Sequence, residues 1–285
     1  MSRIQHPQLA GTWYAGDARS LRRQVDELLR AAEPAATQAP LRGVIVPHAG
    51  YVYSGRAAAA AYACLRATPY RRAVILAPSH FVAFRGVAVL NTDAFETPLG
   101  AVRVDRDGVA ALLSAPLFSD DPEPYREEHS LEIQLPLLQS VLPEVRVVPA
   151  LLGDLTRNDQ SSVAGVLQQL VDDETIVIVS SDFVHYGSRF GYLPFPAAGP
   201  EAVRARLREL DMGAVERVCA GDAAGFRRYV TDTGATICGR TPIAVFLTMH
   251  AARTVGQLLT YYTSLDVTGD YEHCVSYASI AFARP

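Results

Sequence analysis

The sequence predicts a single-domain α/β sandwich, in which helices flank a largely parallel or mixed central sheet. Three apolar, β-branched segments, 43–46, 73–77 and 175–179, each end at a proline or serine that leads into polar residues. Continuous apolar strands of this kind belong to sheets that are covered on both faces. Segments with helical periodicity alternate with the strands, which favours layers of helix over sheet. No repeat or linker divides the chain, so we predict one domain over residues 1–285.

The composition is typical of a globular protein and gives no sign of a nucleic-acid surface. Of the 285 residues, 49% are hydrophobic and 20% are charged, and the mean hydropathy is +0.09. The net charge of -4 provides no electrostatic footprint for nucleic acid, so we expect no such partner. The sequence contains no lysine, and all 26 basic residues are arginine. Schiff-base and lysine-nucleophile chemistry are therefore excluded.

Cysteine usage and hydropathy predict a cytoplasmic protein. The four cysteines, Cys64, Cys219, Cys238 and Cys274, are far apart and form no C-x-x-C pair, as expected in a reducing compartment. The first residues lack the charged-then-apolar pattern of a signal peptide. No apolar run approaches the roughly 18 residues that a membrane span needs, so we expect no membrane partner.

In the first half of the chain, hydrophobic periodicity defines the helices and strands. Asp17 suits the N-cap of a helix in which Leu21 and Val25 begin an apolar stripe. The predicted helices are 18–31, an Ala-rich segment at 54–67, and 106–114, which contains a glycine at 108. The predicted strands are 43–46, 73–77 and 86–90. The Ala- and Pro-rich stretch 33–40 and the acidic stretch 119–128 are predicted to be loops, the second of them exposed.

In the second half, predicted helices and strands continue to alternate. Ser130 suits the N-cap of a helix that contains Pro136, which predicts either a kink or a short first segment. The pair Thr241 and Pro242 suits another helix start. The remaining predicted helices are 157–171, 200–219, 222–230 and 241–253. The remaining predicted strands are 145–152, 175–179, 257–264 and 274–282.

Three of the predicted strands lead into histidines at their carboxyl ends. His48 and His80 follow the first two of these strands, and Asp182 and His185 follow the third. In open α/β sheets, ligands bind outside the carboxyl ends of the strands. Imidazole is the commonest protein ligand for transition metals, and two histidines with one anionic ligand leave coordination positions open for catalysis. We therefore predict a metal site at these strand ends.

The residues alone leave four candidates for the anionic ligand, namely Asp182, Glu132, Cys238 and Cys64. Asp182 and Glu132 each lie three residues from a histidine, and either would complete a two-His, one-carboxylate iron site. Cys64 lies among alanines within a predicted helix, which is typical of a core residue. Cys238 lies just before a predicted helix start, a setting that can lower a thiol pKa and expose the thiol. Spacing does not rank Cys238 above Asp182.

Several common active-site motifs are absent from the sequence. The phosphate-binding patterns G-x-x-x-x-G-K-S/T and G-x-G-x-x-G do not occur, so nucleotide binding has no support. The pattern G-x-S-x-G is also absent, which argues against an α/β-hydrolase nucleophile. The histidines outside the strand ends and their neighbouring motifs, His6, His250 and His273, are interpreted as structural or surface residues.

Six short motifs, taken together, resemble one known family. They are TWY at 12–14, PHAGY at 47–51, PSH at 78–80, EHSLE at 128–132, SSDF at 180–183 with His185, and ICGR at 237–240. On these motifs, which span nearly the whole chain in the family's order, the sequence resembles the Memo family. The bacterial and archaeal branch of that family is called AmmeMemoRadiSam system protein B. The family is similar in fold to the class III extradiol dioxygenases, so the resemblance implies that fold here.

The resemblance also implies a ligand set. Extradiol dioxygenases bind non-haem iron through two histidines and a carboxylate, whereas the matching pocket of Memo proteins has two histidines and a cysteine. The corresponding positions here are His48, His80 and Cys238. The resemblance puts Asp182 and His185 around this set as catalytic residues, with His185 as the acid or base. The pocket residues expected beside them are Trp13, Tyr51, His129 and Glu132.

Two functions follow from this resemblance. A site of two histidines and one thiolate would hold divalent iron or copper, with zinc as a further option, and would make the protein a dioxygenase-like redox enzyme. The alternative is a non-enzymatic module that uses the same pocket for a small molecule, a peptide or a protein, or that buffers metal. The family name implies a functional link to a radical-SAM protein and an Ammecr-type protein. The sequence lacks the C-x3-C-x2-C motif, so it is not itself the radical-SAM partner.

Overall fold

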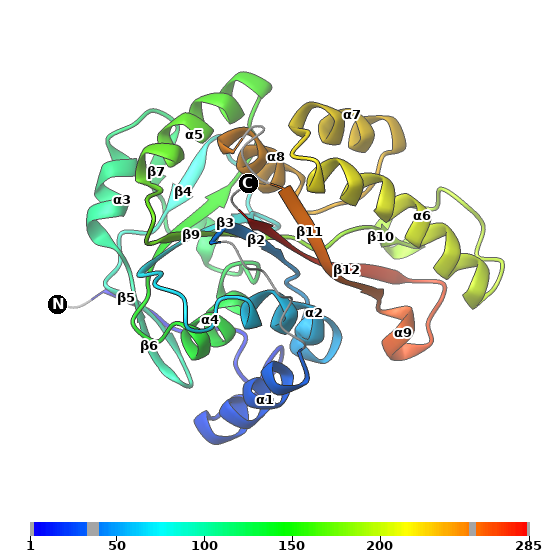
Figure 1. Cartoon of the computed structure of the whole chain (residues 1–285), viewed down its shortest axis with the longest axis horizontal. Coiled ribbons are helices and arrows are strands. Elements are labelled where there is room, and N and C mark those ends of the chain that lie inside the picture. Colours follow the sequence, from blue (N-terminus) through cyan, green and yellow to red (C-terminus); the bar gives the residue numbers. More distant parts are fainter. Residues whose placement is uncertain (1–2, 33–39, 251–254, 284–285) are drawn as a thin grey trace.

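A nine-stranded mixed sheet forms the centre of the molecule (Figure 1). The computed structural model describes residues 3–32, 40–250 and 255–283. The four central strands run parallel and are β2 (Leu41–Val46), β9 (Thr175–Ser180), β3 (Arg72–Pro78) and β8 (Arg146–Leu152). Most of their residues are buried, as the continuous apolar runs predict for strands covered on both faces.

Antiparallel strands flank this parallel centre on both sides. β12 (Cys274–Ala283) pairs with β2, and it also pairs with β11 (Val255–Thr263) and β10 (His185–Tyr186). On the other side, β4 (Val87–Val89) pairs antiparallel with β8 and parallel with β7 (Phe118–Asp120). A separate three-stranded sheet joins β1 (Ile4–Gln5), β5 (Ala94–Thr97) and β6 (Gly100–Arg103).

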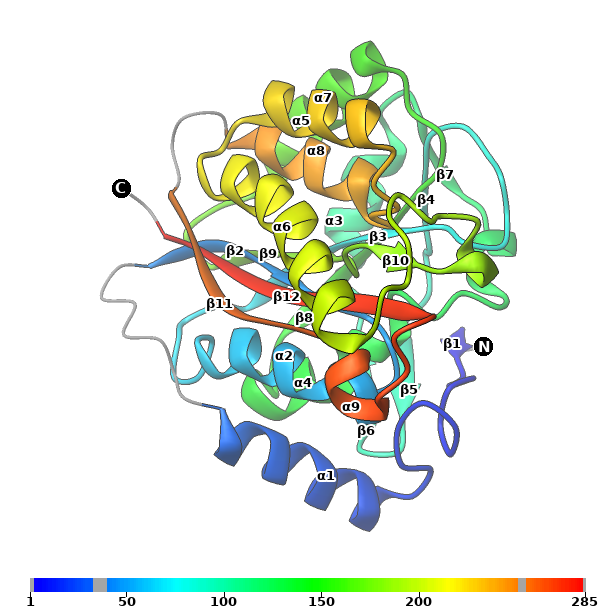
Figure 2. The same ribbon diagram turned by 90° about the vertical axis from the view of Figure 1, so that its right-hand side faces the viewer.

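Helices cover both faces of the large sheet (Figure 1, Figure 2). One layer consists of α1 (Ala18–Ala31), α2 (Tyr51–Ala63) and α4 (Leu135–Val141). The opposite layer consists of α3 (Arg106–Leu113), α5 (Arg157–Leu170), α6 (Pro200–Cys219), α7 (Ala223–Thr233) and α8 (Arg240–Met249). The short α9 (Leu265–Thr268) follows β11. The predicted fold class, a mixed sheet flanked by helices, is therefore confirmed.

Local chemistry explains where several helices begin. The Asp17 side chain caps α1 by accepting the backbone N–H of Ser20. Thr156 and Asp159 form a reciprocal capping box at the start of α5. The alanines of α2 are almost all buried, and their small side chains let this helix pack closely against β2, β11 and β12. These features fix the positions of the loops that follow the central strands.

Pro136 does not kink a helix, because the helix begins later than Ser130 predicts. A 3-10 turn (Glu132–Gln134) comes first, and Pro136 then lies in the first turn of α4, where its missing N–H costs nothing. Of the two predicted alternatives, the short first segment is correct. The Ala-rich helix is also displaced, since α2 begins at Tyr51 rather than at 54 and ends at Ala63 rather than at 67.

The exposed acidic loop predicted at 119–128 is wrong in two respects. Strand β7 covers its beginning, and a 3-10 turn (Glu123–Tyr125) forms in its middle. Glu128 at its end is buried, because backbone and imidazole N–H groups surround its carboxylate. The hairpin of β5 and β6 was not predicted from the sequence. The helix predicted at 241–253 ends earlier, since α8 ends at Met249 with His250 as its C-cap. The predicted loop at 33–40 falls largely on 33–39, which lie outside the described residues.

Over the described ranges, no helix combines the length and the hydrophobicity that a transmembrane span requires.

Candidate metal centre

Three histidines meet at the carboxyl edge of the parallel strands. His48 follows β2 and His80 follows β3, and both strands are neighbours of β9. His129 comes from the loop that precedes the 3-10 turn at Glu132–Gln134. Each of the three histidines offers one ligand atom, and these atoms all lie within 4.8 Å of one another. The cluster could therefore hold a metal ion.

The hydrogen bonds of His48 determine which of its ring nitrogens is free. Its Nδ1 lies 2.9 Å from the Oγ of Ser180. The Ser180 hydroxyl donates its single proton to the carbonyl oxygen of Ser130, 2.6 Å away, and accepts an N–H from the Gln134 amide. Ser180 must therefore accept a second hydrogen from Nδ1 of His48. This tautomer leaves the Nε2 lone pair of His48 available to a metal.

The environment of His48 also keeps its ring neutral. Burial, and next the charge of His80, lower the pKa of His48 well below its usual range. Metal ligation requires the neutral imidazole, so this shift suits a ligand. The backbone N–H of His48 donates to Oδ1 of Asp182 at 2.8 Å, which fixes the turn that carries the ring.

His80 is held by a buried carboxylate. The Glu128 oxygens accept its backbone N–H at 2.5 Å and its Nδ1–H at 2.8 Å, and they also accept the backbone N–H groups of His129 and Ser130. Burial alone would raise the pKa of Glu128. The hydrogen bond from His80 and the charge of His80 outweigh this effect of burial, and the pKa of Glu128 falls to about 2. A carboxylate that orients a histidine in this way is typical of metal sites.

The ring of His129 stacks on that of His80 and contacts the tilted ring of Trp13. Its ring centroid lies 4.5 Å from that of His80 and 4.5 Å from that of Trp13. Burial, and next the charge of His80, lower the pKa of His129 to about 4. Its Nδ1 is buried and has no hydrogen-bond partner among the described residues, and the nearest ion-pair partner, Oε1 of Glu128, lies 3.4 Å away. A metal ion would satisfy an imidazole that the protein leaves without a hydrogen-bond partner.

Cys238 lies beside the free nitrogen of His48. Its Sγ is 3.1 Å from Nε2 of His48 and 3.2 Å from the backbone nitrogen of Asp182. Burial, and next the negative charge of Asp182, raise the pKa of the Cys238 thiol. The direction of this shift is opposite to the lowered thiol pKa expected from the sequence, and the exposure expected of the thiol is only partial, since Cys238 is half-buried. Burial likewise raises the pKa of Asp182, although the charge of His185 opposes that effect.

A glycine explains why Cys238 can come so close to the strand end. The backbone N–H of Gly239 donates to Oγ of Ser181 at 3.1 Å. A Cβ at position 239 would lie only 2.4 Å from Cβ of Ser181. Only glycine lets the start of α8 approach β9 this closely.

His185 is fixed with one nitrogen free. Its Nδ1 donates to the carbonyl oxygen of Thr236 at 3.0 Å, and its backbone N–H donates to Oγ1 of the same residue. The Nε2 of His185 therefore carries the lone pair. His185 is not one of the three clustered histidines, and it follows Asp182 by three residues, at the start of β10.

Comparison with known proteins assigns the chain to a protein family. A sequence model of the family described as Memo-like protein matches residues 5–281. This chain belongs to the Memo-like protein family. The MEMO1 family protein of Methanopyrus kandleri is 36% identical over 98% of this chain and 98% of its own length. The memo-1 homolog of Caenorhabditis elegans is 32% identical over 97% and 82%, and mouse Protein MEMO1 is 32% identical over 84% and 81%.

In this Memo-like chain, two of the predicted pocket residues have structural partners. Both carboxylate oxygens of Glu132 accept hydrogens from the N-terminal segment, namely the backbone N–H groups of Gln8 and Leu9 and the hydroxyl of Tyr14. Glu132 thereby holds the segment that carries Trp13. The buried Tyr51 donates its hydroxyl to the carbonyl oxygen of Ile133. The fourth candidate for the anionic ligand, Cys64, lies at the end of α2 and donates to Ala60, in line with a core residue.

A cavity of about 440 Å³ lies near the centre of this Memo-like protein, although none of the clustered histidines lines it. Its lining includes Trp13, whose ring contacts that of His129, and Ala49, which follows His48 in the chain. Tyr53, Phe190 and Tyr277 form an aromatic wall, and the charged part of the lining comprises Arg189, Asp270 and His273. The ring of Phe190 packs against the ring of His185 at 5.2 Å. The volume of this cavity is in the range found for small-molecule binding sites.

Sequence reasoning missed the residues that orient the ligands. Glu128 was noted only as part of a motif, and Ser180 only as the end of a strand. His129 was predicted to line the pocket, whereas the structure groups it with His48 and His80. Adjacency to a histidine was the one signal that pointed to Glu128, and its actual partner, His80, lies 48 residues away.

Proposed function

We propose that this Memo-like protein is a mononuclear iron or copper protein that carries out redox chemistry in the cavity beside the histidines. The observation that carries the proposal is the orientation of two rings. Ser180 and Glu128 hold the Nδ1–H of His48 and His80, so both Nε2 atoms are left for one metal ion. Family membership adds weight to the assignment.

We propose Cys238 as the third ligand, with His129 as a further donor. The 3.1 Å separation of the Cys238 Sγ from Nε2 of His48 supports a shared ion, and the cluster distances support His129. A thiolate makes the donor set softer than two histidines and a carboxylate, which favours copper more than in the dioxygenases. Zinc is the third ion to be tested, since the same donors suit it.

A bound iron or copper ion would supply one-electron redox chemistry. The chain contributes the rest. The Nε2 of His185 can accept a proton from a substrate and return it, because the Thr236 carbonyl holds the proton on Nδ1. Asp182 keeps the His48 turn in place, and the aromatic wall of the cavity would position an apolar or aromatic small molecule.

The second candidate is a binding or metal-buffering module that uses the same pocket. Its support is the exposure of Phe81 and Phe190, which are 59% and 40% exposed and pack against His80 and His185. Exposed aromatic side chains are frequent at peptide- and protein-binding sites. The link to a radical-SAM protein and an Ammecr-type protein stays a prediction from the family resemblance.

The metal content of the loaded protein and of its variants tests the proposed metal centre. We expect close to one iron or copper ion per chain, measured by plasma mass spectrometry after anaerobic loading with Fe(II), Cu(I) or Zn(II). His48→Ala and His80→Ala should lose the ion, because each removes one oriented Nε2. Cys238→Ser and His129→Gln tell which of the two completes the ligand set.

The matched control is His6→Ala, since His6 is exposed, pairs with Glu96 and lies outside the cluster. It should keep full metal content. If His48→Ala and His80→Ala retain as much metal as His6→Ala, the proposed centre is wrong. Loaded protein that binds a partner but consumes no oxygen with any offered substrate would favour the second candidate.

A further inference from the structure

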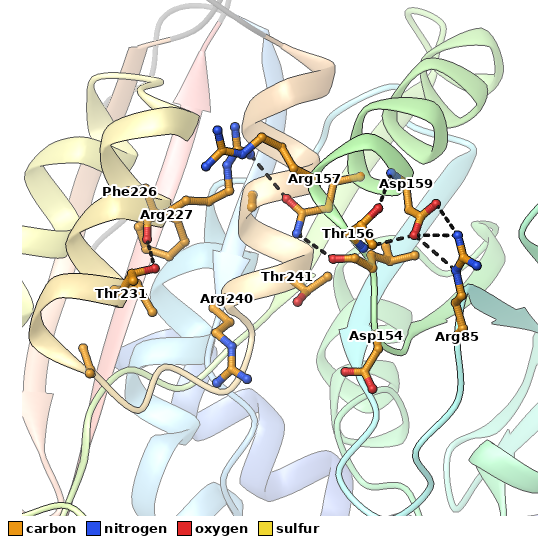
Figure 3. Close-up of a pocket in the computed structure, with 16 residues that line it drawn as sticks. Arg85, Asp154, Thr156, Arg157, Asp159, Phe226, Arg227, Thr231, Arg240 and Thr241 are labelled. Atoms are coloured by element: carbon orange, nitrogen blue, oxygen red, sulfur yellow. Dashed lines mark hydrogen bonds and ion pairs between the residues drawn. The ribbon is translucent and has the colours of Figure 1, made fainter.

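A second cavity, of about 740 Å³, lies between α5, α7 and α8 (Figure 3). None of the clustered histidines lines it. Four arginines do, and they come from separate parts of the chain: Arg85, Arg157, Arg227 and Arg240. Because these arginines are far apart in the sequence, the sequence alone does not predict that they form a cluster.

Most of this positive charge is not neutralised by the protein. Arg85 pairs with Asp159 at 3.0 Å, so these two charges cancel. Within the ranges that the structure describes, no carboxylate oxygen lies within ion-pair distance of the other three arginines. Asp154 is the one further carboxylate of the lining, and the nearby Asp222 caps α7 by accepting the N–H of Gly225. The cavity therefore keeps an excess of positive charge in a protein whose net charge is -4.

Two of the guanidinium groups lie side by side. Figure 3 shows the side chain of Arg157 reaching from the start of α5 to that of Arg227, which comes from α7. Burial, and next the charge of Arg157, lower the pKa of Arg227. Two like charges that point toward each other repel, and an anion between them would convert repulsion into attraction.

The hydrogen bonds of Arg227 are poorly satisfied. Its Nε is buried and has no hydrogen-bond partner among the described residues. Its Nη1 makes only long contacts, 3.4 Å to the Gln160 amide oxygen and 3.5 Å to the Thr248 hydroxyl. Buried polar groups normally have a partner, so these donors indicate a missing acceptor. A phosphate presents several acceptor oxygens to paired guanidinium groups.

We propose that this cavity binds a small phosphorylated molecule, with the phosphate between the guanidinium groups of Arg157 and Arg227. The first turn of α5, at which Arg157 lies, adds its positive helix end. The volume exceeds what a phosphate alone requires, and the half-buried Leu155 and Val230 give an apolar surface for the remainder of the molecule. This inference is independent of the metal centre.

Calorimetric titration tests the proposal, with inorganic phosphate and phenyl phosphate as probes at constant ionic strength set by chloride. We expect phenyl phosphate to bind more tightly than inorganic phosphate. Arg157→Gln and Arg227→Gln should each weaken the binding of phenyl phosphate about tenfold or more, because each removes charged hydrogen bonds. Arg157 is exposed, so its variant keeps the fold even where Arg227→Gln does not.

The matched control is Arg228→Gln, whose exposed side chain neighbours Arg227 on α7 but does not line the cavity. It should bind like the wild type. The titration is repeated with metal-free His48→Ala, so that phosphate on a metal ion is not counted. The proposal is overturned if phenyl phosphate gives no heat beyond that of chloride, or if Arg228→Gln weakens binding as much as Arg157→Gln does.

Discussion

Two single residues decide which ring nitrogen of His48 and of His80 would face a metal in the proposed centre. Ser180 can only accept from Nδ1 of His48, because its own proton is donated to Ser130. Glu128 accepts the Nδ1–H of His80 through a charged oxygen. If the proposed centre is correct, its metal affinity depends on groups that never contact the ion.

Replacing Glu128 by glutamine tests this dependence. Oε1 of Glu128 accepts the Nδ1–H of His80 and the backbone N–H groups of His129 and Ser130, and Oε2 accepts the backbone N–H of His80. The amide keeps only one of these two acceptors, and its NH2 group then faces an N–H donor, so the turn that carries the His80 ring is displaced. We expect metal affinity to fall about 10- to 100-fold, measured by competition with a chelator of known affinity. Glu127→Gln changes the exposed neighbour and should leave the affinity unchanged. Equal affinities for the two variants would contradict the role assigned to Glu128.

Among the helices and strands, the close approach of α8 to β9 brings Cys238 to the histidines. Gly239 makes this approach possible, since a Cβ there would lie 2.4 Å from Cβ of Ser181 and 2.8 Å from the carbonyl oxygen of Ser180. Any larger residue must push the start of α8 away from the strand end. The position of the thiol is thus a property of two packed elements rather than of the cysteine alone.

Gly239→Ala should therefore affect both stability and metal binding. We expect a loss of about 1–3 kcal/mol in the free energy of unfolding from overpacking, together with weaker metal binding. The control is Gly165→Ala, an exposed position of α5 at which a Cβ meets nothing within 4 Å. At that position the better helix propensity of alanine should raise the free energy of unfolding by about 0.5–1 kcal/mol. Urea unfolding measures both changes, and equal stability of the two variants would refute the packing explanation.

Many of the helices and strands could be predicted from the sequence. The bounds of α1 and α6 match the predictions at 18–31 and 200–219, because caps and apolar periodicity are local signals. The start of α2 was not predicted correctly, since Gly50 rather than Ser54 is its N-cap. The strands of the β5–β6 hairpin were also missed, because four residues carry too little periodicity to detect.

The stability of the whole molecule depends on pH through a buried carboxyl group, Asp211, for which no ion pair is found among the described residues. Asp211 of α6 accepts the backbone N–H of Val184 and the hydroxyl of Tyr261, and it thereby joins α6 to β11 and to the residue before His185. Burial raises its pKa from 3.8 to about 6, although the hydrogen bonds from Tyr261 and Val184 oppose the shift.

The raised pKa fixes the sign of this dependence. Between about pH 4 and 6 the folded protein keeps a proton on Asp211 that the unfolded chain has lost, so a rise in pH through this window lowers stability. In Asp211→Asn this loss is absent. The free energy of unfolding of the variant minus that of the wild type should therefore rise by about 2 kcal/mol from pH 4.5 to pH 7.5, as measured by urea unfolding. The exposed Asp232→Asn should show no such gain. A pH-independent difference between Asp211→Asn and wild type would disprove the assignment.

The sequence by itself determined the four central strands, most of the helices and the position of His48 and His80 at strand ends, because turns and periodicity act over a few residues. It also determined the family, since the motifs keep their order along the chain. Only the tertiary structure decided that Ser180 orients His48, that Glu128 orients His80 and that Cys238 lies beside Nε2. It likewise gathered the four arginines of the second cavity. These pairs are 48 to 190 residues apart, or lie on separate helices, and their contacts exist only once the parallel strands and the helix layers have packed together.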